Sequence, residues 1–171
     1  MNYKRLYIPN ALIFITVVTH DRKEILLENI EYLRDAFKTA KKKYLFEIIA
    51  IIVNKDHFHM IINPAKIDLY PKIIGCIKST FTRLSDLKHA YKNKNRESDI
   101  WQRRYWEHSI ISENDLYRHI DYIHYNSMKH YNIAPKDWKY SSFHKFVEKG
   151  YYDENWCNFN DKYDIISMDL E

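Results

Sequence analysis

The chain has very little glycine: Gly75 and Gly150 are the only two in 171 residues. A glycine-rich loop that wraps phosphate groups is therefore excluded. Long apolar runs are also missing, because no stretch of 18 apolar residues occurs and the first five residues lack the apolar segment of a signal peptide. We therefore expect a soluble, intracellular protein without a membrane partner.

Cysteine is equally scarce, and its placement excludes a cysteine-based site. Cys76 and Cys157 lie far apart and have no metal-binding spacing. They fit a reducing compartment and neither is expected to be catalytic. Hydrophobic residues make up 46% of the sequence. A chain of this length and composition predicts one domain with a real core rather than a disordered protein.

Charge is unevenly distributed along the chain. Residues 151–171 contain six acidic residues and one basic residue, whereas residues 1–150 carry 26 basic and 17 acidic residues, a net charge of +9. We expect residues 1–150 to form the functional domain and residues 151–171 to form an acidic C-terminal tail. A basic body favours a polyanionic partner. Charge alone leaves open a basic protein with no such partner.

Aromatic residues make up 16% of the chain, and 15 of them are tyrosines. Several lie beside basic residues, as in residues 103–106, 89–92 and 117–119. This mixture is typical of proteins that bind single-stranded nucleic acid, in which bases stack on rings and cations contact phosphates. The same rings are equally compatible with ordinary packing.

Hydrophobic periodicity predicts an alternation of strands and helices. Strands are expected at residues 11–19, 46–53, 57–63 and 105–111, and helices at 28–43, from Pro71 onward and at 113–129. The part that follows, through residues 135–143, is expected to be irregular or to form a last short helix. We expect an α+β protein in which β-α-β-β-α-β gives a ferredoxin-like antiparallel sheet with two helices on one face, followed by an added C-terminal helix. Proteins with that fold have many different functions, so the fold alone does not identify the function.

The third expected strand carries His57-Phe58-His59. Because side chains alternate along a strand, His57 and His59 share one face, which we expect to be the exposed face of the sheet. Two imidazoles placed in this way can bind one divalent metal ion, although such a pair is also common as polar surface. Asp56 is a candidate to orient one of the two rings.

The helix expected at 113–129 carries a second candidate site. Tyr122 and Asn126 are four residues apart and therefore share a face, which His119 borders. The apolar stripe of this helix (Leu116, Ile120, Ile123) is a different face, so Tyr122 is expected at its edge and need not be buried. A tyrosine becomes a nucleophile only where its phenolate is stabilised, for example by a metal ion and by Arg118 and Lys129. Spacing alone does not select this tyrosine from fifteen.

Taken together, these motifs resemble the HUH single-tyrosine transposase family, and most closely its transposase IS200-like branch of REP-associated tyrosine transposases (RAYT). The resemblance spans roughly residues 5–145. In chain order, it is carried by residues 7–8 with 14–17, 57–60, 77–82, 100–108, 121–126 with 129–130, and 138–144. One departure is that the family's asparagine is usually followed by proline and later glycine, whereas Asn126 is followed by Ser127-Met128-Lys129, which lets the helix continue.

The resemblance implies a metal-dependent transesterification of single-stranded DNA. His57 and His59 correspond to the family's metal ligands for Mg²⁺ or Mn²⁺, Asn126 stands where relatives place a polar third ligand, and Tyr122 corresponds to the nucleophile. The implied reaction forms a 5′-phosphotyrosine and releases a 3′-OH, and its reversal rejoins strands. Substrates of this family are hairpin-forming repeats, so we expect a cytoplasmic, nucleoid-associated prokaryotic protein that is monomeric or homodimeric.

Contacts to DNA are expected from basic and aromatic side chains near these motifs. They are Arg5, Tyr7, Lys78, Arg83, Arg103, Arg104, Tyr105, Trp106, Arg118, His119 and Lys129. Two alternatives to the transposase-like reaction stay open at this point. One is a metal-dependent phosphodiesterase that uses water, with Tyr122 structural. The other is a non-catalytic protein that binds single-stranded nucleic acid.

Overall fold

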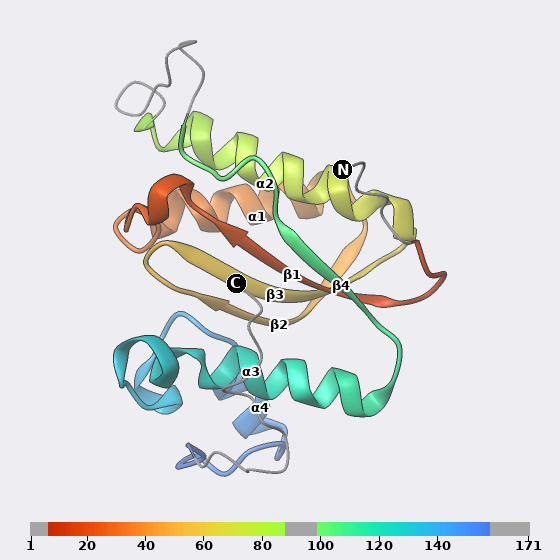
Figure 1. The fold of residues 1–171 in the computed structure, drawn as a ribbon, viewed down its shortest axis with the longest axis vertical. Coiled ribbons are helices and arrows are strands. Elements are labelled where there is room, and N and C mark those ends of the chain that lie inside the picture. The colour runs from red at the N-terminus through yellow and green to blue at the C-terminus, as the bar shows by residue number, and fades with distance from the viewer. Residues whose placement is uncertain (1–6, 88–98, 158–171) are drawn as a thin grey trace.

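The expected order of strands and helices is present in the computed structural model, which describes residues 7–87 and 99–157 (Figure 1). The main elements are β1 (Leu12–Val18), α1 (Ile30–Lys43), β2 (Phe46–Val53), β3 (His57–Pro64), α2 (Tyr70–Leu84), β4 (Trp106–Ile110), α3 (Glu113–Tyr131) and α4 (Phe143–Glu148). The four strands form one antiparallel sheet in the order β2-β3-β1-β4. This confirms the ferredoxin-like α+β prediction.

The two helices α1 and α2 pack on one face of the sheet (Figure 1). Every second residue of the two central strands points toward them, for example Ile13, Ile15 and Val17 of β1 and Phe58 and Met60 of β3. All five side chains are buried in one apolar cluster together with the inner faces of the two helices. This face is therefore a conventional hydrophobic core.

The opposite face is covered by α3, with α4 beyond it, so the sheet lies between two helical layers (Figure 1). Phe14, Ala50 and Ile61 from the strands meet Ile120 and Ile123 of α3 in a second buried cluster. The sequence analysis expected this face to be exposed, and that was wrong. The tyrosine-bearing helix folds back over the sheet because its apolar stripe needs a partner surface.

The ends of α3 explain its length. Ser112 is the N-cap, and its Oγ accepts a hydrogen bond from the Asp115 backbone N–H at 3.2 Å. At the other end Asn132 adopts the left-handed conformation (φ 53°) and its N–H caps the Met128 carbonyl. With no proline or glycine between Asn126 and Tyr131, the helix continues to Tyr131 and keeps Lys129 and His130 in helical register with Tyr122.

The segment after α4 is tied to α3 as far as the structure describes it. Tyr152 is buried, its hydroxyl donates to Asp121 Oδ1 at 2.6 Å, and its ring stacks on Phe143. Burial and the nearby Asp121 carboxylate raise the pKa of Tyr152 above its ordinary value. Within the expected acidic tail, Tyr152 and Trp156 therefore pack on the domain, and residues 158–171 lie outside the described residues. Among helices in the described ranges, none is long and apolar enough to cross a membrane.

Candidate active site

His57 and His59 lie on the α3 face of β3, with ring centroids 4.9 Å apart. Phe58 between them is buried in the opposite core, as strand alternation predicts. Both histidines are completely enclosed beneath α3 rather than exposed as expected. An imidazole pair buried this deeply requires polar partners.

Each ring is held through its Nδ1 atom. Nδ1 of His57 lies 2.6 Å from Asp56 Oδ1, and Nδ1 of His59 lies 2.8 Å from Thr16 Oγ1 on β1. Burial raises the pKa of the Asp56 carboxyl, but the hydrogen bond and charge of His57, with a contribution from Arg22, outweigh it and hold that pKa below its ordinary value. A carboxylate or hydroxyl on Nδ1 is the arrangement that directs Nε2 of a histidine toward a metal ion.

Tyr122 lies directly against this pair. Its side chain is only 1% exposed, more deeply buried than its expected position at the edge of the stripe, and its ring centroid is 5.2 Å from that of His59. Lys129, two turns further along α3, donates a hydrogen bond from Nζ to the Tyr122 hydroxyl at 3.1 Å. The structure thus brings together, within one chain, the two motifs that spacing could not connect.

Asn126 reaches the same point from one turn further along α3, and there it meets Asn54. Asn54 Nδ2 donates to Asn126 Oδ1 at 2.5 Å and lies 2.9 Å from His57 Nε2. Within the described part of the chain, the other amide atoms, Asn54 Oδ1 and Asn126 Nδ2, are buried without a hydrogen-bond partner. Two orphaned polar atoms beside two imidazoles indicate a site that is complete only with a further polar group.

Sequence reasoning missed Asn54 and His130. Asn54 falls between the strands expected at residues 46–53 and 57–63, although Ala50 and Ile52 face α3 and the same alternation places Asn54 there. The ring of His130 is 4.9 Å from that of His57, and its spacing of four residues from Asn126 was the available signal.

The donor set fits a divalent cation. Two imidazoles supply nitrogen, the amide oxygen of Asn126 supplies a hard donor, and the orphaned amide atoms show that hydrogen bonds among the described residues do not satisfy the site. Mg²⁺ and Mn²⁺ accept such mixed sets and complete their coordination with water and phosphate oxygens. The expectation of a divalent metal at His57, His59 and Asn126 therefore agrees with the side chains present.

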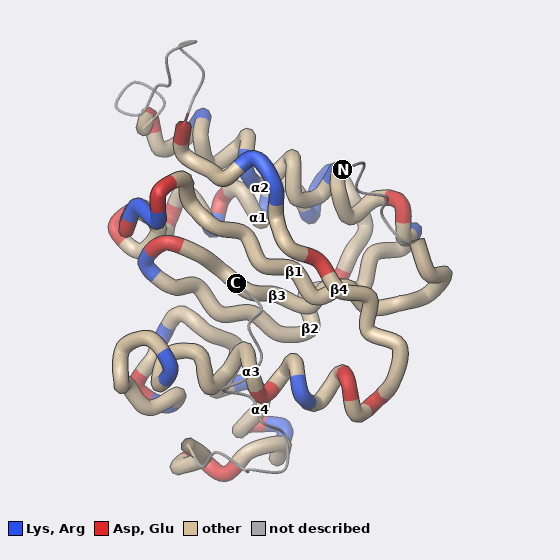
Figure 2. Tube along the Cα trace, in the orientation of Figure 1, with Lys and Arg blue, Asp and Glu red and all other residues tan. Residues whose placement is uncertain are grey.

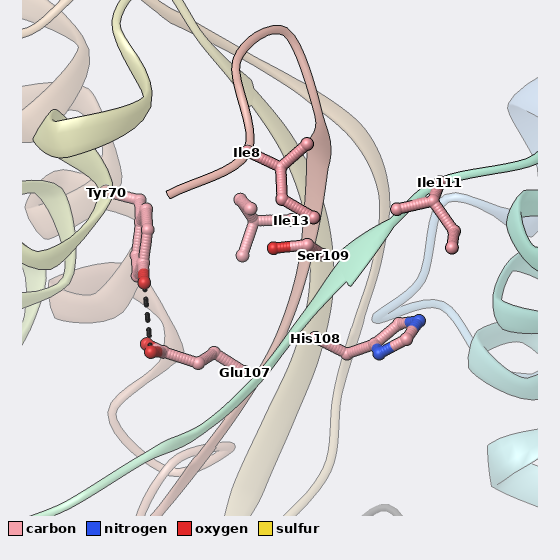
Figure 3. A pocket seen from close by; sticks show the side chains of 7 residues that line it. All are labelled: Ile8, Ile13, Tyr70, Glu107, His108, Ser109 and Ile111. Atoms are coloured by element: carbon pink, nitrogen blue, oxygen red, sulfur yellow. Dashed lines mark hydrogen bonds between the residues drawn. The ribbon is translucent and has the colours of Figure 1, made fainter. Parts of the chain in front are cut away.

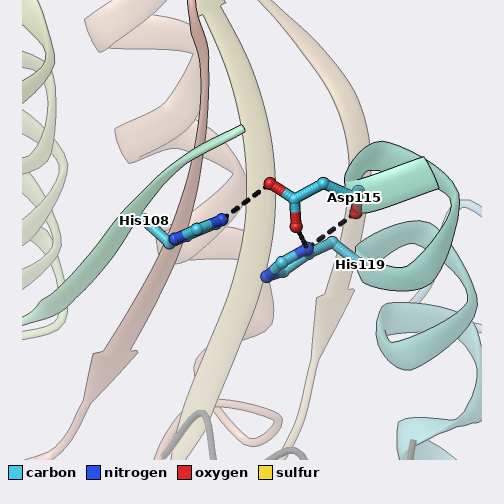
Figure 4. A group of neighbouring side chains, drawn as sticks. All are labelled: His108, Asp115 and His119. Carbon is cyan, nitrogen blue, oxygen red and sulfur yellow. Dashed lines mark hydrogen bonds and ion pairs between the residues drawn. The ribbon is translucent and has the colours of Figure 1, made fainter. Parts of the chain in front are cut away.

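A second group of possible ligands lies between β4 and α3 (Figure 4). His108, Asp115 and His119 offer ligand atoms within 4.8 Å of one another. The Asp115 carboxylate is 2.8 Å from His108 Nε2 and 3.1 Å from His119 Nδ1, and His119 Nδ1 also bonds to the Asp115 carbonyl oxygen. These hydrogen bonds account for the proximity of the three side chains and attach α3 to β4.

His119, expected to contact DNA, is only 3% exposed and packs against Phe14. Its ring is therefore enclosed and does not line an outer surface. Arg118 is half-buried, and the exposed Tyr7 ring packs beside Tyr70 at 5.7 Å. Arg5 lies outside the described residues.

The other expected DNA contacts divide between the two faces of the sheet. Trp106 is 38% exposed and its ring contacts Phe14 and His108 on the α3 side. Basic residues of α2 and of the segment before β4 lie on the other side (Figure 2). There Lys78, Arg83, Arg103 and Tyr105 line an open groove of about 540 Å³, in which Lys78 Nζ donates to the Gln102 carbonyl at 2.7 Å. Arg104 is exposed nearby.

A smaller pocket of about 310 Å³ lies between the start of β1, α2 and β4 (Figure 3). The Tyr70 hydroxyl donates to Glu107 Oε1 there at 2.9 Å, and burial together with this carboxylate raises the pKa of Tyr70. None of the proposed metal ligands lines it, so this pocket is separate from the histidine pair.

Comparisons with known proteins agree with this arrangement. The transposase IS200-like family model matches residues 8–126. A Haemophilus influenzae protein provisionally named REP-associated tyrosine transposase is 43% identical over 162 residues, which cover 91% of this chain and 92% of that protein. The REP-associated tyrosine transposase of Escherichia coli K12 is 34% identical over 158 residues, which cover 91% and 90%.

A solved structure of a REP-associated tyrosine transposase bound to a REP hairpin shares the fold. The TM-score is 0.80 at 32% identity, and the alignment covers 94% of this chain and 95% of that one. The matched family span contains both histidines, Tyr122 and Asn126. The chain belongs to the transposase IS200-like family.

Proposed function

We propose that this protein cuts and rejoins single-stranded DNA through a covalent bond to Tyr122. The observation that carries the proposal is the convergence of Tyr122, Lys129 and the His57–His59 pair at one buried point. Membership of the transposase family supports a reaction on DNA. The relative that binds a REP hairpin supports hairpin-forming repeats as the substrate class.

The proposed mechanism assigns a role to each side chain. Lys129 stabilises the Tyr122 phenolate through the hydrogen bond at its oxygen. His57, His59 and Asn126 would hold Mg²⁺ or Mn²⁺, and such an ion would supply Lewis-acid polarisation of the scissile phosphate. The Tyr122 hydroxyl gives up its proton to solvent, its oxygen forms a bond to phosphorus, and the bond from phosphorus to the 3′ oxygen breaks. The 3′ oxygen takes up a proton from solvent and leaves as a 3′-OH, and the 5′ phosphate stays on Tyr122.

The proposed DNA surface extends over both sides of the sheet. The exposed Trp106 ring offers a base a stacking platform on the α3 side. On the other side, flanking phosphates and bases are bound by Lys78, Arg83, Arg103 and Tyr105, which line the groove, and by the exposed Arg104. Since Tyr122 and both histidines come from the same chain, a monomer suffices for cleavage. Such a substrate places the protein at the nucleoid, in the cytoplasm of a prokaryotic cell.

The test uses a hairpin-forming single strand labelled at either end, incubated with the protein and Mn²⁺. We expect the 3′-labelled fragment to run with the protein on a denaturing gel, and the 5′-labelled fragment to be released with a free 3′-OH. Tyr122→Phe and EDTA should both abolish the adduct. Tyr125→Phe on the same helix is the matched control and should retain it.

Three other outcomes would contradict the proposal. Cleavage without an adduct would indicate a phosphodiesterase that uses water. Binding without cleavage would indicate a non-catalytic single-strand-binding protein. An adduct that persists in Tyr122→Phe would assign the nucleophile to another residue.

A further inference from the structure

We propose that Asn54 is a fourth protein ligand of the divalent metal ion, through its Oδ1 atom. This inference rests on the proposed function, since it assumes that His57, His59 and Asn126 hold the ion. It adds a residue from the end of β2 to a site otherwise built from β3 and α3.

The position of Asn54 is fixed by the sheet. It follows Val53, the last residue of β2, on the face that Ala50 and Ile52 turn toward α3. Its backbone N–H donates to the His57 carbonyl at 2.8 Å, which closes the β2–β3 turn. The side chain is 0% exposed and inserts between His57 and Asn126. Contact with solvent therefore does not explain why this position holds a polar side chain.

The neighbours of the Asn54 amide are both electron-pair donors. Its Nδ2 group lies 2.9 Å from His57 Nε2 and 2.5 Å from Asn126 Oδ1. These two atoms are the same ones that would bind the cation. Neighbouring ligands of an octahedral Mg²⁺ or Mn²⁺ ion lie about 3 Å apart, given metal–oxygen distances near 2.1 Å. The terminal atom of Asn54 therefore stands at ligand spacing from two other ligands.

The amide of Asn54 is suited to both the metal-free and the metal-bound site. Without a cation, its N–H groups face two acceptors, and Oδ1 is left buried without a hydrogen bond. With a cation, both neighbours would direct their electron pairs to the ion. A half-turn of the amide would then present oxygen, the donor that hard cations prefer. This accounts for the orphaned oxygen, which is costly to bury if it has no function.

A different role predicts the opposite effect of mutation. If the Asn54 amide only occupied the site and competed with the ion, removing it would tighten metal binding. If it is a ligand, removing it weakens binding. Asn54→Leu keeps the approximate volume and removes the oxygen, and Asn54→Asp keeps an oxygen and adds negative charge.

The experiment measures Mn²⁺ affinity of the full-length protein by calorimetry and by the electron paramagnetic resonance signal of free Mn²⁺. We expect about 10- to 100-fold weaker binding in Asn54→Leu, the range for losing a group that supports a metal site. Asn54→Asp should bind more tightly than the wild type and show a larger rise in melting temperature on adding Mn²⁺. Asn63→Leu, an exposed asparagine of β3, is the matched control and should bind as the wild type does.

Two comparisons keep the inference separate from the proposed function. His57→Ala and His59→Ala should abolish Mn²⁺ binding; if the wild type binds no Mn²⁺, or binds it without these histidines, both ideas fail. If binding needs the histidines but Asn54→Leu binds Mn²⁺ as tightly as the wild type or more tightly, only the Asn54 inference is overturned. Should Asn54→Leu not fold, weaker binding in Asn54→Asp would equally overturn it.

Discussion

The two faces of the sheet use alternate residues of the same strands and differ in chemistry. The face beneath α1 and α2 is apolar, with Ile13, Ile15, Phe58, Met60 and Ile62 from the central strands. The face beneath α3 mixes apolar residues with buried polar ones. The buried polar side chains on that side include Thr16, Asn54, His57, His59, His119, His124 and Asn126.

This difference separates stability from reactivity. An apolar face gains from each methylene that leaves water, and it needs no specific partners. A buried polar face must satisfy each group, and here Asn54 Oδ1, Asn126 Nδ2 and His119 Nε2 have no hydrogen-bond partner in the described structure. Buried polar atoms without a hydrogen-bond partner are expected where a site binds a further molecule or ion. Mutations on the apolar face should therefore mainly lower stability, and mutations on the polar face should mainly impair the reaction.

The largest contrast is expected between the adjacent residues His59 and Met60. His59→Gln should abolish Mn²⁺-dependent cleavage while costing little stability. Met60→Ala should lower the free energy of unfolding by about 2–5 kcal/mol and leave the chemistry intact in the folded fraction. Urea denaturation and adduct formation, measured on both variants, check this. If both variants lost the same amount of stability, the proposed difference between the two faces would be contradicted.

Next in size is Lys129, which donates to the Tyr122 hydroxyl. Lys129→Met removes a charge-assisted hydrogen bond, a type worth about 1.5–3 kcal/mol, so adduct formation should slow about 10- to 100-fold. Single-turnover rates of adduct formation measure this. Lys72→Met, which changes an exposed lysine of α2, is the control and should not change the rate.

A smaller effect is expected from Trp106, whose exposed ring flanks the α3 face. Trp106→Ala should weaken binding of single-stranded DNA by about 1–3 kcal/mol, the usual contribution of one stacked base. Fluorescence anisotropy with a labelled hairpin strand measures the affinity. Tyr32→Ala, an exposed aromatic of α1, should bind normally. Equal weakening in both variants would remove the case for a local stacking platform.

The last contrast is an acid sensitivity of the α3 face. Burial lowers the pKa of His124 to about 3, and burial also lowers the pKa of His119, although Asp115 opposes it. The His124 ring is therefore neutral in the folded protein over the range in which an unfolded histidine takes up a proton, below about pH 6.5. Stability should fall as pH falls from about 6.5 toward 3, by up to about 1.4 kcal/mol per pH unit for His124, and the lowered pKa of His119 acts in the same direction.

Urea denaturation between pH 7 and 5 measures that slope. His124→Phe should reduce it, because one buried histidine no longer titrates on unfolding. His144→Gln, an exposed histidine, should leave it unchanged. An unchanged slope in His124→Phe would show that the buried ring is not the source.

The elements themselves were largely predictable. Apolar runs rich in β-branched and aromatic residues located the strands, and period-3.6 patterns located the three long helices, since each long helix buries one stripe. The position of α3 on the second face was not predictable, because an apolar stripe shows that a helix packs but not on which surface. For the same reason His57, His59 and Tyr122 were expected to be more accessible than they are.

The sequence by itself determined that His57 and His59 share one strand face and that Tyr122 and Asn126 share one helix face, because backbone periodicity fixes these relations. Only the tertiary structure decided that the two faces meet, that Lys129 reaches the Tyr122 hydroxyl, and that Asn54 joins the site from a third segment. Contacts between segments far apart in the chain depend on how the layers pack, and the spacing of residues along the chain does not specify that packing.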